Sequence, residues 1–295
     1  MKHNGNRVRH RHIRLCLLAA ILSLLALLLR QNVLLGTASK HEILMNVQTG
    51  QVLAKRRVNE ETAPASLTKI MTILLAVEAE PDLDRPVTLP EDIFPALYAQ
   101  DASMAGFAPG ETVTVRDLLY GAMLPSGAEC CETLARQVSG SREAFVALMN
   151  QKAAELGMSR THFSNPTGLT EADHYSTAAD LAKMLRAALQ NETFRTIFTT
   201  EQYTSTPTKQ HPEGVWFAST LLSRLSGTEL SSEEDTILGG KTGYTEAAGL
   251  CLASLARVKD TEYILVTLGA PGNHATAQTN IQDAIEVYRR LENKN

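Results

Sequence analysis

Cysteine is scarce in this sequence and does not occur in a metal-binding arrangement. Of four cysteines in 295 residues, Cys16 lies in an apolar run, Cys130 and Cys131 are adjacent, and Cys251 is isolated. No C-x-x-C pair is present, so the sequence predicts neither a metal site nor a disulfide framework. Because free cysteine commonly packs as a small apolar side chain, we interpret these thiols as buried rather than functional.

The first thirty residues lack acidic side chains altogether. Their basic residues are Lys2, Arg7, Arg9, Arg11, Arg14 and Arg30. This cationic front and the apolar run at 15–29 predict that the N-terminus stays in the cytoplasm and that the rest of the chain is exported. The run is long for a signal peptide and short for a membrane span. Small residues at 36–38 resemble a cleavage site, but we favour a retained anchor.

Basic residues are also in deficit in the exported part. The sequence has 28 Lys and Arg against 32 Asp and Glu, and removing the six basic residues of the leader leaves a formal charge near −10. A nucleic-acid-binding protein needs a basic surface, so we exclude nucleic acid as a partner. The hydrophobic content of 44% is typical of a globular protein.

Strand and helix patterns follow the leader. Two short strands around a glycine turn are predicted at 42–47 and 51–54, and an antiparallel pair at 250–258 and 262–268. A short strand at 87–89 is expected within a loop at 81–95. Helices are predicted at 66–78, 115–124, 128–138, 142–156, 177–190 and 275–291. The strand at 250–258 is apolar on both faces, so we expect helices 66–78 and 275–291 to cover the two faces of the sheet.

Ser66 and Lys69 stand three residues apart at the start of the first predicted helix. Side chains at this spacing share a helix face, so the hydroxyl and the amine can touch. The helix is apolar on nearly every side, which indicates burial, and burial lowers the pKa of a lysine. A neutral Lys69 could accept the Ser66 proton, although an isolated S-x-x-K is more often an ordinary helix start.

Two further motifs give this pair a context. Ser126 lies in the turn at 124–127 between two predicted helices, and Lys241 opens the Lys-Thr-Gly run at 241–243, which leads toward a strand. Alone, the first would be a helix cap and the second a turn. In this order, S-x-x-K, a turn serine and Lys-Thr-Gly form the signature of penicillin-recognising serine acyltransferases.

The sequence resembles the D-alanyl-D-alanine carboxypeptidases of the low-molecular-mass penicillin-binding protein family, a branch of the β-lactamase/transpeptidase-like superfamily. The resemblance covers residues 41–272, with further support at 139–141, 156–158, 161–163, 165–169 and 176–181. It implies an α/β (α+β) fold with an antiparallel sheet flanked by helices. The catalytic domain would span 39–295, with a helical subdomain at about 90–200, after a leader and signal or anchor segment at 1–38.

The resemblance also implies catalytic roles. Ser66 would be the nucleophile and Lys69 its base, while Ser126 would bridge Lys69 and Lys241 and relay a proton to the leaving amine. Lys241 would supply a positive field that helps to keep Lys69 neutral.

Substrate binding is implied for the residues that follow Lys241. Thr242, with Lys241, would hold the terminal carboxylate of the substrate. Gly243 would leave space along the strand edge. The backbone N–H groups of Ser66 and Tyr244 would form the oxyanion hole.

Ala128 departs from the family pattern, which usually has asparagine two residues after the turn serine. The loss of one positioning hydrogen bond costs about 1 to 3 kcal/mol, so we expect a working but slower enzyme. Glu129 is adjacent on the helix, points elsewhere and receives no role. No Ser-His-Asp context surrounds His162, His174 or His211, which we interpret as structural or exposed. Asn165 and Asp180 are interpreted as scaffold residues.

The implied activity is removal of the terminal D-alanine from peptidoglycan stem peptides ending in D-Ala-D-Ala, through an acyl-enzyme on Ser66. β-Lactams would be covalent inhibitors, and no metal or organic cofactor is implied. The protein would be extracytoplasmic, secreted or tethered to the outer face of the cytoplasmic membrane by its N-terminal segment. One alternative is a β-lactamase, although no E-x-x-L-N stretch follows the turn serine. The other is a non-catalytic β-lactam- or peptidoglycan-binding protein, against which the intact motif residues argue.

Overall fold

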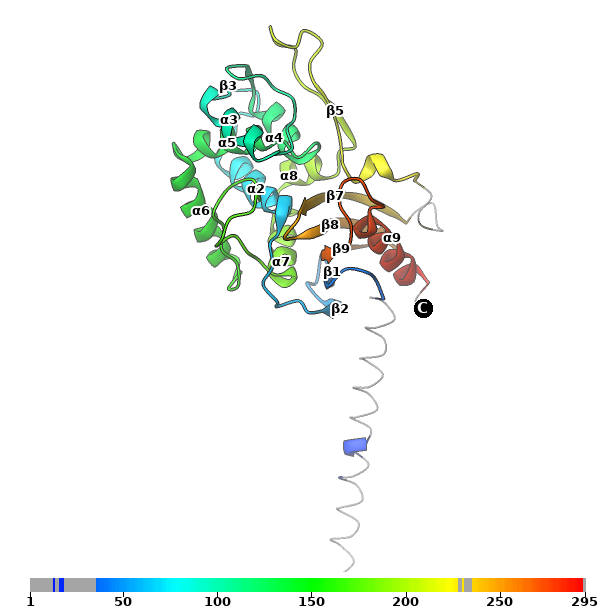
Figure 1. Ribbon diagram of the computed structural model, residues 1–295. Helices are drawn as coiled ribbons and strands as arrows, with labels where there is room; N and C mark the ends of the chain where they lie inside the picture. Colours follow the sequence, from blue (N-terminus) through cyan, green and yellow to red (C-terminus); the bar gives the residue numbers. More distant parts are fainter. Residues whose placement is uncertain (1–12, 14–15, 19–35, 228–229, 231–234, 294–295) are drawn as a thin grey trace, which may run out of the picture.

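The computed structural model describes residues 13, 16–18, 36–227, 230 and 235–293 (Figure 1). The predicted basic leader and apolar run therefore lie outside the described residues, apart from these few positions before 36. Among the residues that are described, no helix is long and apolar enough to cross a membrane.

A five-stranded antiparallel sheet forms the centre of the fold, in the order β2-β1-β9-β8-β7. Its strands are β1 (His41–Asn46), β2 (Val52–Arg56), β7 (Thr236–Thr245), β8 (Gly249–Val258) and β9 (Thr261–Ala270). Both predicted antiparallel pairs, β1 with β2 and β8 with β9, are confirmed. Lys259 and Asp260 join β8 to β9 with φ values of 50° and 58°, as a type I′ hairpin turn requires. Strand β7 lies at the edge of the sheet.

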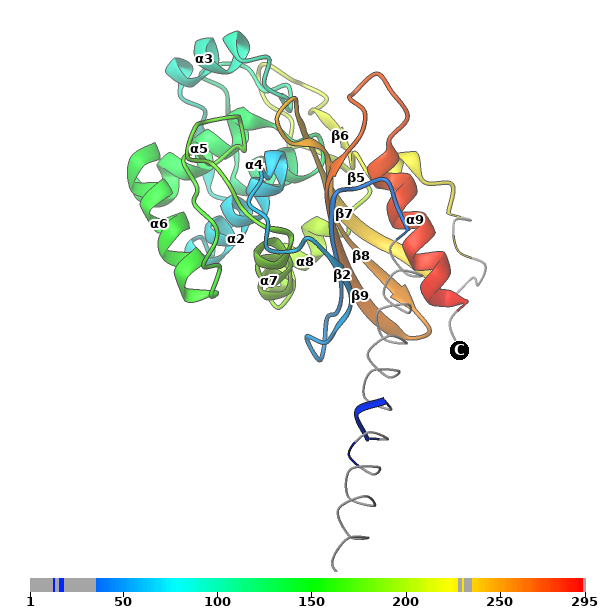
Figure 2. The ribbon, with the colours of Figure 1, turned by 60° about the horizontal axis from the view of Figure 1, so that its bottom comes forward.

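Helices cover both faces of the sheet, as predicted (Figure 2). Helix α9 (Thr279–Glu292) packs against β8 and β9 on one face and begins four residues later than predicted. On the other face, α7 (Ala178–Ala188), α8 (Glu192–Phe198) and the 3₁₀ turn η1 (Ala65–Thr68) contact the strands. The α-helix after η1 is α2 (Lys69–Ala79), and it packs mainly against other helices. The helix predicted at 66–78 therefore covers the sheet only through its first turn, η1, and α7 and α8 cover the rest of this face.

The remaining helices lie on the far side of α2 from the sheet (Figure 1). They are η2 (Glu91–Ile93), α3 (Phe94–Ala99), α4 (Val115–Met123), α5 (Ala128–Ser139) and α6 (Arg142–Glu155). The described part of the chain also has two small antiparallel strand pairs. These are β3 (Pro86–Thr88) with β4 (Thr112–Thr114), and β5 (Gln202–Thr204) with β6 (Trp216–Ala218). The 3₁₀ turn η3 (Leu222–Arg224) follows β6. The limits of the helical subdomain, at about 90–200, stay a prediction. Two helices within that range, α7 and α8, pack on the sheet.

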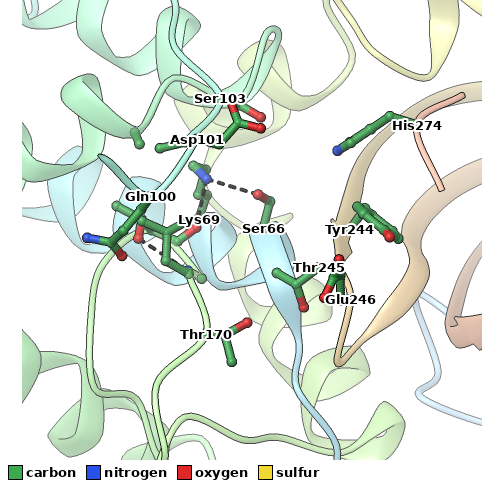
Figure 3. Close-up of a pocket in the computed structure, with 15 residues that line it drawn as sticks. Ser66, Lys69, Gln100, Asp101, Ser103, Thr170, Tyr244, Thr245, Glu246 and His274 are labelled. Carbon is green, nitrogen blue, oxygen red and sulfur yellow. Dashed lines mark hydrogen bonds between the residues drawn. The ribbon is translucent and has the colours of Figure 1, made fainter. Parts of the chain in front are cut away.

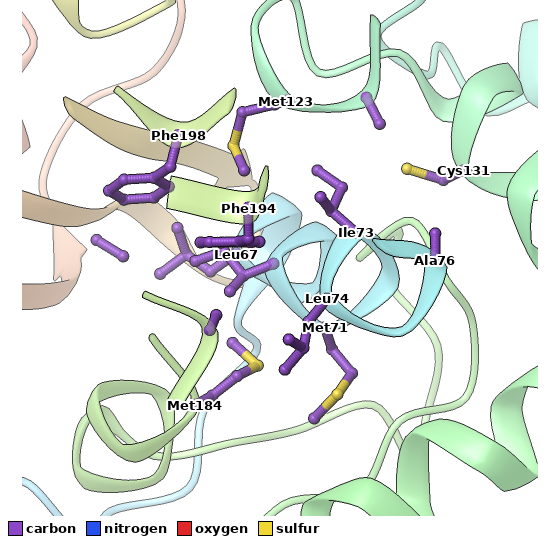
Figure 4. Close-up of a cluster of buried hydrophobic side chains, with 14 of the residues drawn as sticks. Leu67, Met71, Ile73, Leu74, Ala76, Met123, Cys131, Met184, Phe194 and Phe198 are labelled. Carbon is purple, nitrogen blue, oxygen red and sulfur yellow. The ribbon is translucent and has the colours of Figure 1, made fainter. Parts of the chain in front are cut away.

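Helix α2 is the centre of the main hydrophobic core (Figure 4). Eight of its eleven residues are buried. Leu67 and Met71 lie among side chains from α7 and α8, such as Met184 and Phe194. Burial of each large apolar side chain stabilises the fold by about 1.5 to 3 kcal/mol. These contacts fix the start of α2, and with it Lys69, relative to the sheet.

The cysteines are free thiols in the described part of the chain. Cys130, Cys131 and Cys251 are buried, as predicted, whereas Cys16 is exposed. Burial raises the pKa of the Cys131 thiol to about 12, so this side chain behaves as a neutral core residue.

Candidate active site

Ser66 lies in the 3₁₀ turn η1 rather than in the α-helix that was predicted to begin there. Ala65 has a φ of +48°, which is incompatible with a right-handed helix, so the chain enters α2 through a tight turn. Residues three apart eclipse each other in a 3₁₀ turn, and Lys69 is thus still brought beside Ser66. Lys69 Nζ and Ser66 Oγ lie 2.9 Å apart (Figure 3).

Lys69 is held in an environment that favours its neutral form. The side chain is 3% exposed, and burial lowers the pKa of its amine, with Cys131 and Glu129 acting in the opposite direction. Lys69 Nζ also donates a hydrogen bond of 2.7 Å to the Thr167 carbonyl oxygen. A neutral amine can make this bond and still offer its lone pair to the Ser66 hydroxyl. The pair can therefore act as nucleophile and base.

The Thr167 carbonyl is positioned by Asn165. The Asn165 side-chain oxygen accepts hydrogen bonds from the backbone N–H groups of Thr167 (3.1 Å) and Gly168 (2.7 Å), and its amide donates to the Leu169 carbonyl. Asn165 is therefore a scaffold residue, as predicted, and it fixes the loop that faces Lys69.

Replacement of Gly168 by alanine is expected to displace the nucleophile. Gly168 has a φ of +84°, and a Cβ there would lie 1.9 Å from the Ala65 carbonyl oxygen and 2.9 Å from the Ser66 nitrogen. We expect Gly168→Ala to lower kcat at least about 10-fold, because a misplacement of 1 Å can cost about 100-fold. Steady-state kinetics and thermal denaturation would measure both effects.

Gly157→Ala is the matched control for this variant. Gly157 also has a positive φ, of +67°, but a Cβ there would have nothing within 4 Å. We expect it to lose about 1 to 2 kcal/mol of stability from backbone strain alone, with unchanged kcat. Equal kinetic behaviour of the two variants would contradict the proposed contact between Gly168 and η1.

Ser126 lies in the turn between α4 and α5, and it lines a cavity together with Ser66. It has a φ of +72° and is only 6% exposed. Its Oγ has no hydrogen-bond partner among the described residues, so the predicted bridge between Lys69 and Lys241 is not made in this structure. A buried hydroxyl without a partner costs free energy, so this one is available to a ligand. Ser126, Ser66 and Thr242 line one small cavity.

The Lys-Thr-Gly motif lies within strand β7, whereas the sequence indicated only that it leads toward a strand. A Cβ at Gly243 would lie 3.0 Å from the Ser66 nitrogen and 3.2 Å from the Ala65 Cβ. The space left by Gly243 is thus filled by the η1 backbone. Gly243 also lines the smaller cavity, so its predicted role in making room for substrate stays a prediction.

Lys241 is entirely buried and lies behind the cavities rather than on their surface. Its Nζ donates a hydrogen bond of 2.9 Å to the Thr242 carbonyl oxygen. Burial, and next the charge of Lys69, hold the pKa of Lys241 well below its ordinary range. Lys69 thus lowers the pKa of Lys241, whereas the pKa of Lys69 is shifted by burial and by nearby thiols and carboxylates, so the predicted positive field of Lys241 on Lys69 stays a prediction.

Two adjoining cavities open beside Ser66. The larger, of about 440 Å³, is lined by Ser66, Lys69, Ala128, Tyr244 and residues 167–170 among others (Figure 3). The smaller, of about 70 Å³, also contains Thr242 and Gly243. Of the predicted site residues, all except Lys241 line at least one cavity.

Ala128 lines the larger cavity, where an asparagine would have carried a polar side chain toward it. Its backbone N–H donates to the Ser103 carbonyl oxygen at 2.8 Å. Glu129 instead accepts hydrogen bonds from the backbone of Ala105 and Gly106, at 2.7 and 3.0 Å. Glu129 therefore holds a neighbouring loop, in agreement with the prediction that it does not replace the missing asparagine.

Sequence reasoning missed several cavity residues. Ser103 and His274 line both cavities, and Thr220 and Arg224 line the smaller one. The ring of His274 meets the ring of Tyr244 edge-on, with centroids 4.8 Å apart. These four residues lie in loops or short turns without a motif. Among the described residues, no group of three or more His, Cys, Asp or Glu side chains is placed to hold a metal ion.

His174 supports the turn η1, which carries Ser66, through hydrogen bonds. The Ser164 N–H donates to His174 Nδ1 at 3.0 Å, so His174 Nε2 carries the proton and donates to Thr68 Oγ1 at 2.7 Å. Thr68 Oγ1 in turn donates to the Ala65 carbonyl oxygen at 2.9 Å. The structural role predicted for His174 is confirmed.

This chain of hydrogen bonds predicts a loss of stability in acid. Burial lowers the pKa of His174 to about 4, whereas the unfolded chain binds a proton at about 6.5. The unfolded state is therefore favoured progressively as the pH falls from about 6.5 to 4, by a total of about 3 kcal/mol. Urea denaturation between pH 7 and pH 4.5 should show that the wild type loses more stability than His174→Gln. A difference that does not vary with pH would contradict this assignment.

The sequence matches the peptidase S11 family, described as D-alanyl-D-alanine carboxypeptidase, over residues 31–272. It is 38% identical over 243 residues to D-alanyl-D-alanine carboxypeptidase DacF of Bacillus subtilis (strain 168), covering 80% of this chain but only 58% of that relative. It is 35% identical over 224 residues to a D-alanyl-D-alanine carboxypeptidase of Streptomyces sp. (strain K15), covering 72% and 74% of the two chains.

Solved structures show the same fold. The crystal structure of the Streptomyces K15 DD-transpeptidase superimposes with a TM-score of 0.77 at 30% identity, over 86% of this chain and 97% of that one. A D-alanyl-D-alanine carboxypeptidase from Mycobacterium tuberculosis H37Rv gives a TM-score of 0.75 at 29% identity, over 88% and 92%. The predicted transpeptidase-like fold is confirmed.

Proposed function

Because the chain belongs to the peptidase S11 family of D-alanyl-D-alanine carboxypeptidases, we propose that it removes the terminal D-alanine from peptidoglycan stem pentapeptides. The observation that carries this proposal is the 2.9 Å contact between Ser66 Oγ and the buried Lys69 amine, at the floor of an open cavity. An activated hydroxyl beside a cavity is what acyl transfer through a covalent serine needs.

Acylation begins with proton transfer to Lys69. The neutral amine takes the Ser66 proton while Ser66 Oγ attacks the carbonyl carbon of the penultimate D-alanine. The N–H groups of Ser66 and Tyr244 donate to the oxygen that becomes negative. The close approach of η1 and β7 at Gly243 supports this pair of N–H donors, because it brings the backbone at Ser66 near that at Tyr244.

Departure of D-alanine requires a proton on its nitrogen. As the C–N bond breaks, Ser126 passes its proton to that nitrogen and is reprotonated from Lys69. Ser126 lines the smaller cavity with Ser66, and its buried hydroxyl, unpaired among the described residues, is available to the leaving nitrogen. The product is an ester between Ser66 and the shortened peptide.

Hydrolysis of the ester completes the cycle. Water attacks the ester carbonyl, gives one proton to Lys69, and the bond to Ser66 breaks as Lys69 returns the proton to Ser66 Oγ. A β-lactam amide would acylate Ser66 by the same first step. These steps use side-chain and backbone groups alone.

The N-terminal sequence supports a place of action outside the cytoplasm. The basic leader and the apolar run at 15–29 support export of the folded part and its attachment to the outer face of the cytoplasmic membrane. The substrate, a cell-wall peptide, is found on that side.

Incubation of the purified full-length protein with a defined pentapeptide ending in D-Ala-D-Ala tests the function. The expected products are free D-alanine and the tetrapeptide, and a fluorescent penicillin should label the protein. Labelling without release of D-alanine would indicate a binding protein. Rapid nitrocefin turnover would indicate a β-lactamase.

A further inference from the structure

Trp216, in strand β6, is the only tryptophan of the sequence, and its side chain is largely in contact with solvent. It is 61% exposed, whereas tryptophan is on average a well-buried residue. Within the described part of the chain from residue 36 onward, the other exposed large apolar side chains are Val52 on β2 and Tyr98 on α3. The exposure of Trp216 marks a candidate contact surface.

The alternation of side chains along β6 turns Trp216 outward. Its neighbour Phe217 is 1% exposed and packs edge-on against Phe107, with ring centroids 5.6 Å apart. Tyr203, the β5 partner of Phe217, donates a hydrogen bond of 2.8 Å to the buried Asp117 carboxylate. These contacts fix the inner face of the β5–β6 pair, so its outer face presents Trp216 on a firmly held backbone.

The outer face of this strand pair is polar around the indole. Thr204 lies directly opposite Trp216 in the β5–β6 register, and Gln202 lies opposite Ala218. Opposite residues in antiparallel strands share a face, and Gln202 and Thr204 are both exposed. A flat apolar ring beside groups that donate and accept hydrogen bonds matches a pyranose sugar, which has an apolar C–H face and a rim of hydroxyls.

The size and place of this surface distinguish between partners. A standard protein interface buries about 800 Å² on each side, whereas a tryptophan side chain offers at most about 250 Å², which suits a single sugar ring better. Strand β5 lies at the end of the molecule opposite to β1 and β2, and the N-terminal segment enters the domain at β1 (Figure 1). A membrane attached through that segment would therefore lie away from Trp216.

The β5–β6 pair is continuous with the surface around the reactive serine. Thr220 follows Trp216 by four residues and lines the smaller cavity together with Ser66, so the Cα atoms of Trp216 and Thr220 are at most about 14 Å apart. An extended pentapeptide spans about 17 Å. A glycan strand whose stem peptide enters the cavity can therefore also reach Trp216.

We propose that Trp216 stacks against a sugar ring of the peptidoglycan glycan strand, while Gln202 and Thr204 meet the sugar hydroxyls. This inference rests on the proposed function and extends its substrate from a free peptide to a peptide that is still attached to glycan. The enzyme then prefers glycan-linked stem peptides to the same peptides without sugar.

The fluorescence of the full-length Ser66→Ala protein tests the inference, because all tryptophan emission comes from Trp216 and this variant cannot form the acyl-enzyme. The probes are a disaccharide-pentapeptide ending in D-Ala-D-Ala and the same pentapeptide without the disaccharide. We expect the disaccharide probe alone to shift the emission to shorter wavelength. In calorimetry it should bind about 5 to 10 times more tightly than the peptide, the range of a single aromatic contact.

Adding Trp216→Ala should remove this preference, so that the two probes bind equally, and Trp216→Tyr should retain part of it. Tyr98→Ala is the matched control, because Tyr98 is an aromatic residue of similar exposure, 59%, and lines neither cavity. It should keep the full preference. Circular dichroism would verify that each variant is folded.

Equal binding of the two probes to the protein with Trp216 intact, or a preference that survives Trp216→Ala, would overturn the inference. Emission that responds to phosphatidylglycerol vesicles but not to the disaccharide probe would also overturn it and assign the surface to lipid.

Turnover by the protein with Ser66 intact separates this inference from the proposed function. Release of D-alanine with the same kcat/KM from both probes would reject the sugar contact and leave the carboxypeptidase standing. A Trp216-dependent preference in binding without release of D-alanine from either probe would do the reverse.

Discussion

Ser66→Ala is expected to reduce D-alanine release by about 10⁴- to 10⁶-fold, the loss typical of removing a serine nucleophile. The variant loses the atom that forms the covalent bond, while the peptide-binding surface remains. Ser66 is half-buried and makes its side-chain contact with Lys69, so stability should change little. Stopped-time assays of D-alanine and mass spectrometry of the β-lactam adduct would measure the loss.

Ser159→Ala provides the control, because Ser159 is exposed and remote from the cavities. It should retain full activity and the adduct. If Ser66→Ala still released D-alanine at more than about one hundredth of the wild-type rate, another residue would have to be the nucleophile.

Lys69→Met and Lys69→Arg should both reduce acylation by about 10²- to 10⁴-fold, the usual contribution of a general base. Methionine fills a similar volume without a basic atom. Arginine keeps the charge but cannot lose its proton at physiological pH. Burial lowers the pKa of Lys69, so the wild-type rate should rise with pH as the amine loses its proton, at a pH below the ordinary lysine range.

Both Lys69 variants should lose that rising limb in the pH profile of acylation by a chromogenic β-lactam. Lys55→Met, on the far edge strand β2, should leave the profile unchanged. An active Lys69→Arg protein with a wild-type profile would show that Lys69 is not the base.

Features with a local cause were predictable from the sequence. Contact between Ser66 and Lys69 depends on a spacing of three, and it persists although η1 is a 3₁₀ turn. The β8–β9 pair combines two apolar strands with a two-residue turn. Helix α6 has Ser141 as its N-cap, which accepts a hydrogen bond from the Ala144 N–H.

Features that depend on tertiary contacts were not predictable. Strand β7 contains Gly239 and Gly240, which have low strand propensity. A Cβ at Gly239 would lie 2.3 Å from the Phe198 carbonyl oxygen, so glycine is needed there for packing against the end of α8. The loop predicted at 81–95 includes the start of helix α3, where Pro95 is tolerated because it stands in the first turn of the helix. Arg224 approaches the cavity only through the path of the chain after β6.

The two glycines that flank the nucleophile have a consequence for when the protein becomes active. Gly168 from one loop and Gly243 from the edge strand both lie so close to Ala65 and Ser66 that neither position has room for a Cβ. These three segments are separated by about a hundred and by seventy-five residues of sequence, so their contacts exist only once the chain has its native tertiary structure. A nascent or partly folded chain carries an ordinary serine, and reactivity toward its substrate is acquired in one step with the native structure.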